Sequence, residues 1–213
     1  MIYNIYLIIL AISFGCSLVS FKRQYPNHLK LFSIFIGLSL ITELAAFLMP
    51  KITGVNNNMQ IYNLYRLPEF ICVTLFFKMI IPNKYVQWFI ICSWVIYPLF
   101  WAWYLFIATE LGVWSGVLAN IIGVYGILLS VIYLYRLYLA DEMVSIKRNA
   151  EFWIAVGILF FEATSTPTFG VLLYLTQKDA KRALELVPML TVFNIVMYII
   201  FIYAFLCRKT KLP

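Results

Sequence analysis

The chain has 213 residues, of which 64% are hydrophobic, 18% aromatic and only 12% charged. Because soluble domains carry about 25% charged residues, this composition excludes an ordinary soluble protein and predicts an all-α protein that crosses a membrane several times. The net charge of +7 is then explained by basic cytoplasmic loops beside the lipid bilayer, so nucleic acid is not an expected partner.

Seven apolar segments predict seven transmembrane helices, which together form a single transmembrane domain over residues 1–213. Their approximate bounds are 1–21, 28–50, 60–82, 87–108, 112–138, 151–176 and 185–207. The first segment has no basic residue before it and is followed at once by Lys22 and Arg23, which favours a retained anchor over a cleaved signal peptide. No connecting loop is long enough for a soluble domain, so we expect the function within the membrane or on its surfaces.

The segment 60–82 is the most unusual of the seven, because it combines the length of a membrane span with charged residues. Asn63, Arg66 and Glu69 follow one another at three-residue steps, which keeps them within roughly a third of the helix circumference. Pro68 removes a backbone donor and allows a kink. Since a charge in hydrocarbon costs several kcal/mol unless it is paired or faces protein, we expect this polar stripe to face other helices.

Isolated polar side chains interrupt four of the other apolar segments, where we expect them to face protein rather than lipid. They are Glu43, Asn120, Glu162, Thr166, Asn194 and Tyr198. Glu162 lies furthest from either helix end, with Ser165 and Pro167 beside it, so we predict that it is the functional carboxylate. The segment 87–108 is instead rich in aromatic residues, which is typical of an interfacial belt and of packing.

Cysteine and histidine give little support for metal or nucleophilic chemistry. The four cysteines all lie in apolar segments without the spacing of a metal site, which predicts small apolar residues rather than a disulfide framework. The one histidine, His28, lies in a predicted loop. We therefore expect no metal site, no cofactor and no catalytic residue, and we lean against an enzyme.

The distribution of lysine and arginine predicts the orientation, because these residues are enriched in cytoplasmic loops. With the N-terminus outside and the C-terminus in the cytoplasm, eleven of the sixteen basic residues lie inside and four lie outside. The inner residues are Lys22, Arg23, Lys30, Lys78, Lys84, Arg136, Lys147, Arg148, Arg208, Lys209 and Lys211, and the outer ones are Lys51, Lys178, Lys181 and Arg182. We therefore predict a multi-pass protein of the inner (plasma) membrane in this orientation.

This orientation places the polar residues of five helices at similar depths. At 1.5 Å per residue, Glu43 lies about 10 Å below the outer end of its helix, and the polar residues of three further helices lie roughly 9 to 14 Å below theirs. Glu162 lies near the midplane. The sequence thus predicts an outward-facing polar cavity for a small solute or cation, with three carboxylates facing Arg66. The candidate ligand-binding residues are Glu43, Asn63, Arg66, Glu69, Asn120, Glu162, Thr166, Asn194 and Tyr198.

Each of these groups also has a structural interpretation. Arg66 and Glu69 could neutralise each other within one helix. Glu162 could be a neutral group bonded to neighbouring hydroxyls or to a backbone carbonyl, and Asn194 and Tyr198 could join helices through hydrogen bonds. These structural interpretations do not explain the excess of negative charge that three carboxylates leave beside one arginine. Either some carboxyl groups are neutral, or a proton, cation or amine shares the site.

The two halves of the chain show a weak internal similarity. FSIFIG (32–37) is similar to FWIAVG (152–157), and each motif precedes an intramembrane glutamate. The segment 60–82 also aligns without gaps with the segment that ends at Pro213. This pattern predicts a parallel three-plus-one-plus-three repeat in which 87–108 is the linker, with binding sites at the interface between the repeats.

Two motifs resemble a pattern in a family of uncharacterised bacterial seven-helix integral membrane proteins. They are YNLYRLPEF (62–70) and EFWIAVGILFFE (151–162). The resemblance implies a seven-helix membrane protein and brings no activity with it. The predicted layout is also similar to that of small sugar and vitamin transporters, although their proline–glutamine signature is missing. No lysine lies in the seventh helix, which argues against a retinal-binding opsin.

The sequence leaves four classes of function open. A protein that binds or transports a small solute or cation fits the predicted cavity and repeat. A sensor or partner subunit that relays ligand occupancy to a cytoplasmic protein fits the seven-helix layout without an output domain. An intramembrane enzyme that uses carboxylates and an oligomeric pore are the two further alternatives. A homo-oligomer is compatible with each of them.

Overall fold

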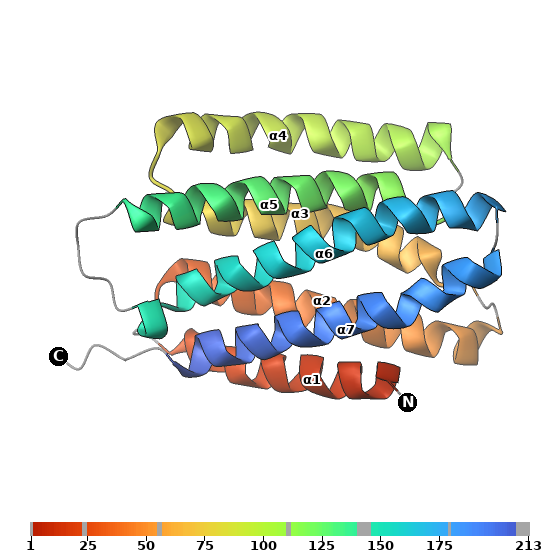
Figure 1. The fold of residues 1–213 in the computed structure, drawn as a ribbon, viewed down its shortest axis with the longest axis horizontal. Helices are drawn as coiled ribbons and strands as arrows, with labels where there is room; N and C mark the ends of the chain where they lie inside the picture. The colour runs from red at the N-terminus through yellow and green to blue at the C-terminus, as the bar shows by residue number, and fades with distance from the viewer. Residues whose placement is uncertain are drawn as a thin grey trace.

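The computed structural model describes residues 2–22, 25–54, 57–109, 112–139, 146–178 and 180–207. These residues form an all-α fold of seven long helices (Figure 1), which confirms the predicted all-α class and the predicted number of helices. The helices are α1 (Ile2–Ser17), α2 (Asn27–Thr53), α3 (Met59–Ile80), α4 (Lys84–Trp103), α5 (Gly116–Tyr138), α6 (Ala150–Lys178) and α7 (Ala180–Leu206). Shorter turns follow α1 (η1, Leu18–Phe21), continue α4 as a π-helix (η2, Tyr104–Ala108) and precede α6 (η3, Ile146–Arg148).

Several helix boundaries differ from the predicted ones, and the local sequence and contacts explain three of them. α7 begins at Ala180 rather than near 185, because the segment 180–185 has high helix propensity and no glycine or proline. α2 continues past Pro50 to Thr53 and ends at Gly54, whose φ of 71° gives the left-handed conformation that terminates many helices. α5 begins at Gly116 rather than 112, because the residues before it form a loop that α3 holds in place.

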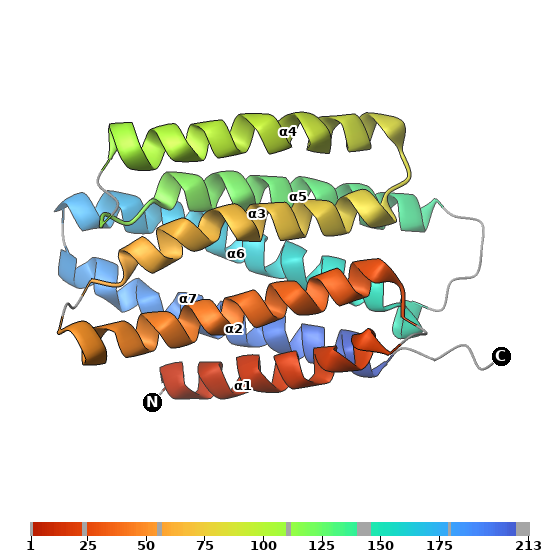
Figure 2. The ribbon, with the colours of Figure 1, turned by 180° about the vertical axis from the view of Figure 1, so that it is seen from behind.

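Six of the helices form a closed ring. α1 contacts α2 and α7, α3 contacts α2 and α5, and α6 contacts α5 and α7. α4 lies outside this ring, where it packs against α3 (Figures 1 and 2). In the order of the ring, α2 and α6 lie opposite each other.

One end of the ring holds the α2–α3, α4–α5 and α6–α7 connections and is called here the α2–α3 end. The other end holds the α1–α2, α3–α4 and α5–α6 connections and is called the α1–α2 end.

Six stretches among the described residues are long and apolar enough to cross a membrane. They are Ile2–Phe21, Asn27–Ile52, Lys84–Ala108, Gly116–Leu139, Ala150–Thr176 and Lys181–Leu206. α3 is the exception, because Asn63, Arg66 and Glu69 lower the hydropathy of its first half. Its place in the structure suits this composition, since α3 packs against α2, α4 and α5 and so has protein on several sides.

Aromatic side chains fill the ring towards the α1–α2 end. Phe32 of α2 is fully buried, and its ring centroid lies 5.1 Å from that of Phe76 of α3 and 4.9 Å from that of Phe201 of α7. The ring centroid of Phe35, also of α2, lies 5.3 Å from that of Phe32. We call these four residues the phenylalanine cluster. It ties α2, α3 and α7 together and leaves little free space between them.

A polar contact joins α2 to α6 at the α1–α2 end, beside the phenylalanine cluster. His28 lies in the first turn of α2, not in the predicted loop, and its Nε2 lies 2.7 Å from Oε1 of Glu151 in the first turn of α6. The imidazole also packs edge-on against Phe76, with 6.1 Å between the ring centroids. The ring is therefore closed at this end both by packing and by a direct contact between opposite helices.

The predicted internal repeat stays a prediction. A two-fold axis along the ring would exchange α1 with α5, α2 with α6 and α3 with α7, which is the order that the contacts give. The equivalent glycines nevertheless pack differently, since Gly37 lies against Phe14 of α1 and Gly157 against Phe201 of α7. The part of the alignment that covers 208–213 lies outside the described residues, as do Arg23, Arg208, Lys209 and Lys211 of the charge count.

Candidate functional site

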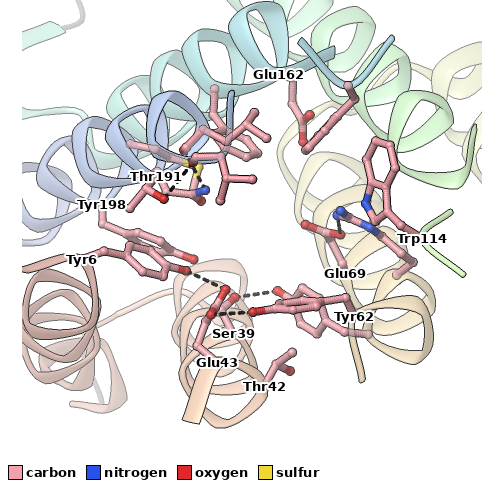
Figure 3. A pocket seen from close by; sticks show the side chains of 18 of the residues that line it. Tyr6, Ser39, Thr42, Glu43, Tyr62, Glu69, Trp114, Glu162, Thr191 and Tyr198 are labelled. Atoms are coloured by element: carbon pink, nitrogen blue, oxygen red, sulfur yellow. Dashed lines mark hydrogen bonds and ion pairs between the residues drawn. The ribbon is translucent and has the colours of Figure 1, made fainter. Parts of the chain in front are cut away.

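A cavity of about 380 Å³ lies inside the ring. Its lining comes from the first turns of α1, the second half of α2, the first part of α3, and much of α6 and α7, together with Trp114 before α5 (Figure 3). Thr176 and Leu184 line it and are exposed, so the mouth lies at the α2–α3 end near the α6–α7 connection. Phe35 and Phe201 of the phenylalanine cluster lie at its inner end.

Three tyrosines hold the carboxylate of Glu43 on one wall of the cavity. Tyr62 of α3 and Tyr3 of α1 donate their hydroxyls to Oε2 at 3.0 Å each, and Tyr6 of α1 donates to Oε1 at 3.0 Å (Figure 3). Tyr3 and Tyr6 are three residues apart and so lie on one face of α1. Their hydrogen bonds fix the Glu43 side chain, but hydroxyls leave its charge uncompensated.

The neighbouring wall carries an ion pair within α3. Nη1 of Arg66 lies 2.6 Å from Oε2 of Glu69, one turn further along the helix, so the pairing within one helix is the arrangement that the structure has. α3 continues through Pro68, which lies between the two residues. The guanidinium carbon of Arg66 also lies 5.8 Å from the ring centroid of Phe169 of α6. This short ion pair accounts for the charge of the one arginine in the cavity lining.

Glu162 lies on the wall opposite Glu43, in a shallow groove that glycines create on α5. A Cβ atom at Gly126 would come within 3.0 Å of the Glu162 side chain, and one at Gly123 would come within 3.0 Å of its Oε2. Only glycine allows this close approach of α5 and α6. The Glu162 side chain is 7% exposed, and Ser165 donates to its Oε2 over a long 3.5 Å. Among the described residues, no basic side chain forms an ion pair with Glu162 or Glu43.

The remaining predicted site residues divide into two groups. Asn194 and Tyr198 of α7 line the cavity; the amide of Asn194 donates to the carbonyl of Leu190 at 3.1 Å, and the Tyr198 ring lies 6.0 Å from that of Tyr6. Asn63, Asn120 and Thr166 do not line it. The predicted residues that the structure brings together around the cavity are Glu43, Arg66, Glu69, Glu162, Asn194 and Tyr198.

The three residues outside the cavity lie in helix contacts. Asn63 is 2% exposed, donates to the carbonyl of Val113 at 2.7 Å and accepts from the N–H of Ser115 at 3.2 Å, so it holds the loop before α5. Oγ1 of Thr166 is buried against Gly123, and Oδ1 of Asn120 is buried on the same helix as that glycine. Neither oxygen has a hydrogen-bond partner among the described residues.

The cavity is therefore negative at two separate places and mostly apolar elsewhere. Its lining holds three carboxylates and one arginine, so two negative charges are left without a basic partner when all three carboxylates are ionised. In the described part of the chain, no three acidic, histidine or cysteine side chains lie together as a metal site. Tyrosine, phenylalanine and leucine side chains form most of the remaining surface. Such a lining is chemically suited to a cationic group attached to an apolar body.

No family model, no curated protein and no solved structure matches this chain. The resemblance of the two motifs in α3 and α6 to a bacterial seven-helix family stays a prediction.

Proposed function

We propose that this protein is a multi-pass protein of the plasma membrane that binds a small solute in the cavity of the helix ring and moves it across the membrane. The observation that carries the proposal is the cavity itself, in which charged groups from α2, α3 and α6 converge with aromatic side chains. Its volume of about 380 Å³ lies in the range of small-molecule sites, which is about 300–1,000 Å³.

The membrane setting of the proposal is supported by composition and charge. Six stretches are long and apolar enough to cross a bilayer, and α3 completes the ring with Arg66 and Glu69 in the lining of the cavity. The lysine and arginine bias gives a cytoplasmic α1–α2 end. In this orientation the mouth of the cavity faces outward, and the phenylalanine cluster closes the path to the cytoplasm. Transport then requires the phenylalanine cluster and the His28–Glu151 contact to open.

A cavity-filling substitution tests whether a solute binds here. Thr191 lines the cavity from α7, whereas its neighbour Val192 points outward and is 41% exposed. Thr191→Trp should remove solute binding, measured as the ligand-induced rise in melting temperature of the purified protein in lipid nanodiscs, and Val192→Trp should retain it. If both variants respond to solutes as the original chain does, the cavity is not the binding site and the proposal is wrong.

A sensor or partner subunit is the second candidate, and the closed α1–α2 end favours it. A protein that only reports ligand occupancy needs no path through the phenylalanine cluster. Solute counterflow in sealed vesicles distinguishes the two, because a transporter exchanges labelled solute across the vesicle wall and a sensor binds it without exchange. If solute binds but no counterflow is observed, the protein is a sensor rather than a transporter, and the cavity is still the site where the solute binds.

A further inference from the structure

We propose that the solute is a linear aliphatic diamine, whose two ammonium groups are bound by Glu43 on one wall of the cavity and by Glu162 on the opposite wall. This inference rests on the proposed function, because it names the class of solute that the same cavity binds. It follows from the number of uncompensated charges, from their positions and from the apolar residues that line the same cavity.

The number of charges calls for two cationic groups. Arg66 is bound by Glu69 at 2.6 Å, so neither member of this ion pair leaves a net charge for a ligand. Glu43 and Glu162 have no basic partner among the described residues, although both line the cavity. A buried carboxylate costs several kcal/mol unless a cation compensates it. A ligand with two positive charges neutralises both carboxylates, whereas a ligand with one positive charge leaves one negative charge uncompensated.

The positions of the two carboxylates call for cationic groups that are held apart. Glu43 lies on α2 and Glu162 on α6, which are opposite helices of the ring, and Figure 3 shows the two side chains on facing sides of the cavity. Each carboxylate is fixed in place, Glu43 by three tyrosine hydroxyls and Glu162 by the close contact of α6 with the glycines of α5. Two fixed charges select one separation between the ligand's ammonium groups.

Each carboxylate retains room for an ammonium group. Glu162 is more than nine-tenths buried, yet its Oε1 accepts no hydrogen bond from the described residues and its Oε2 accepts only the 3.5 Å bond from Ser165. The hydroxyls of Tyr3, Tyr6 and Tyr62 surround Glu43, and the same three tyrosines line the cavity, where aromatic rings attract ammonium groups as well as apolar ones. An ammonium group has three N–H donors to share between a carboxylate oxygen and neighbouring hydroxyls.

The apolar part of the cavity lining is suited to methylene groups. It includes Phe35, Val73, Ile158, Phe161 and Met197, whose side chains offer neither donors nor acceptors of any strength. A polyol or a sugar placed there would lose hydrogen bonds to water without replacing them, whereas an alkyl chain gains from burial. The combination of two charged ends and an apolar middle is the chemistry of an alkyl diamine.

A series of ligands of increasing length tests this inference. Calorimetric titration of the protein in nanodiscs would use ethylenediamine, butanediamine, hexanediamine and octanediamine, with butylamine and butanediol as probes that carry one charge and none. We expect one best spacer length, with the best diamine binding about 10- to 100-fold more tightly than the monoamine, because it gains a second charged contact. Affinity that rises steadily with chain length, or a monoamine that binds as tightly as the best diamine, would overturn the inference.

Substitutions of the two carboxylates locate the contacts. Glu43→Gln and Glu162→Gln should each reduce the affinity of the best diamine to about that of the monoamine, and Glu185→Gln, on an exposed position of α7 outside the lining, should not change it. Glu43→Asp withdraws one carboxylate by a methylene group, so the best spacer should become longer. If Glu43 had a purely structural role, its shortening would not change the best spacer length. An unchanged best spacer length in Glu43→Asp therefore excludes a contact between Glu43 and the ammonium group.

The outcome also separates this inference from the proposed function. If no amine binds but other solutes raise the melting temperature in a manner that Thr191→Trp abolishes, the cavity is a binding site and the diamine assignment alone is wrong. If no solute of any class has this effect, the proposed function fails together with it.

Discussion

Glu43 shows how a carboxylate is held within the ring without a basic partner. Its two oxygens accept three tyrosine hydroxyls from two helices, each at 3.0 Å, so the hydrogen bonds define where the side chain lies. Each hydroxyl has one hydrogen to donate, and here it donates that hydrogen to the carboxylate. An ammonium group of the proposed ligand would compete with the hydroxyls for the same carboxylate oxygens. Tyr3, Tyr6 and Tyr62 therefore belong to the site as positioning residues.

Removal of a single tyrosine hydroxyl should be measurable. Tyr6 is 5% exposed, so Tyr6→Phe leaves an oxygen of Glu43 without its donor and should lower the free energy of unfolding by about 1–3 kcal/mol. Tyr203→Phe is the matched control on α7, because Tyr203 is 44% exposed and its hydroxyl makes no hydrogen bond with the described residues. Equal stability of the two variants in denaturant titrations would mean that the Glu43 contacts contribute nothing to folding.

The sequence identified the acidic residues of the site but not the tyrosines around Glu43. A glutamate in an apolar helix is rare enough to be noticed alone. The chain has fifteen tyrosines, so two of them three residues apart in the first helix carry little information. The position of Asn63 could not be predicted for a related reason, since its polar stripe indicates that it faces protein but does not distinguish the loop before α5 from the cavity.

α6 illustrates how two glycines of one helix serve different purposes. A Cβ atom at Gly157 would come within 2.6 Å of the Phe201 ring in the phenylalanine cluster, whereas one at Gly170 would meet no atom within 4 Å. Both glycines lie inside the helix, where alanine is intrinsically preferred. Position along one helix thus separates a glycine needed for packing from one that is not.

The pair of substitutions Gly157→Ala and Gly170→Ala should act in opposite directions. Gly157→Ala pushes the Phe201 ring away from its neighbours and should destabilise the fold by about 1–3 kcal/mol. Gly170→Ala should stabilise it by up to about 1 kcal/mol through helix propensity. Thermal unfolding in one detergent measures both. A stabilised Gly157→Ala would show that the phenylalanine cluster is loosely packed and does not close the ring tightly.

Helix positions were predicted well, and the arrangement of the helices was not. Apolar length is a local property of the chain, so all seven helices could be found from the sequence, apart from ends such as Ala180 and Gly116 that depend on propensity and on neighbours. The ring depends on contacts between distant segments, such as α1 with α7. Nothing in the local pattern shows that α4 lies outside or that His28 reaches Glu151.

For the whole molecule in its proposed membrane setting, the orientation decides which compartment supplies the proposed solute. A reporter that is active only in the cytoplasm should work when fused after residue 213 and should be inactive when inserted in the 54–58 segment between α2 and α3, because basic residues favour a cytoplasmic α1–α2 end. Enzymatic activity of the two fusions in cells measures this directly. The reverse pattern would turn the cavity mouth towards the cytoplasm and make export, rather than uptake, the direction of any transport.

The contact between α1 and α7 also sets the order in which this protein can be assembled. Five helices separate α1 from α7 along the chain, so the ribosome has made α1 to α6 before the segment that joins the two ends of the ring exists. Until α7 arrives, the helices that carry Glu43 and Glu162 form an open arc whose charged inner face borders the gap. In the proposed membrane setting, the insertion machinery has to shelter that face from lipid, and the cavity is completed in a single late step, when α7 packs between α6 and α1.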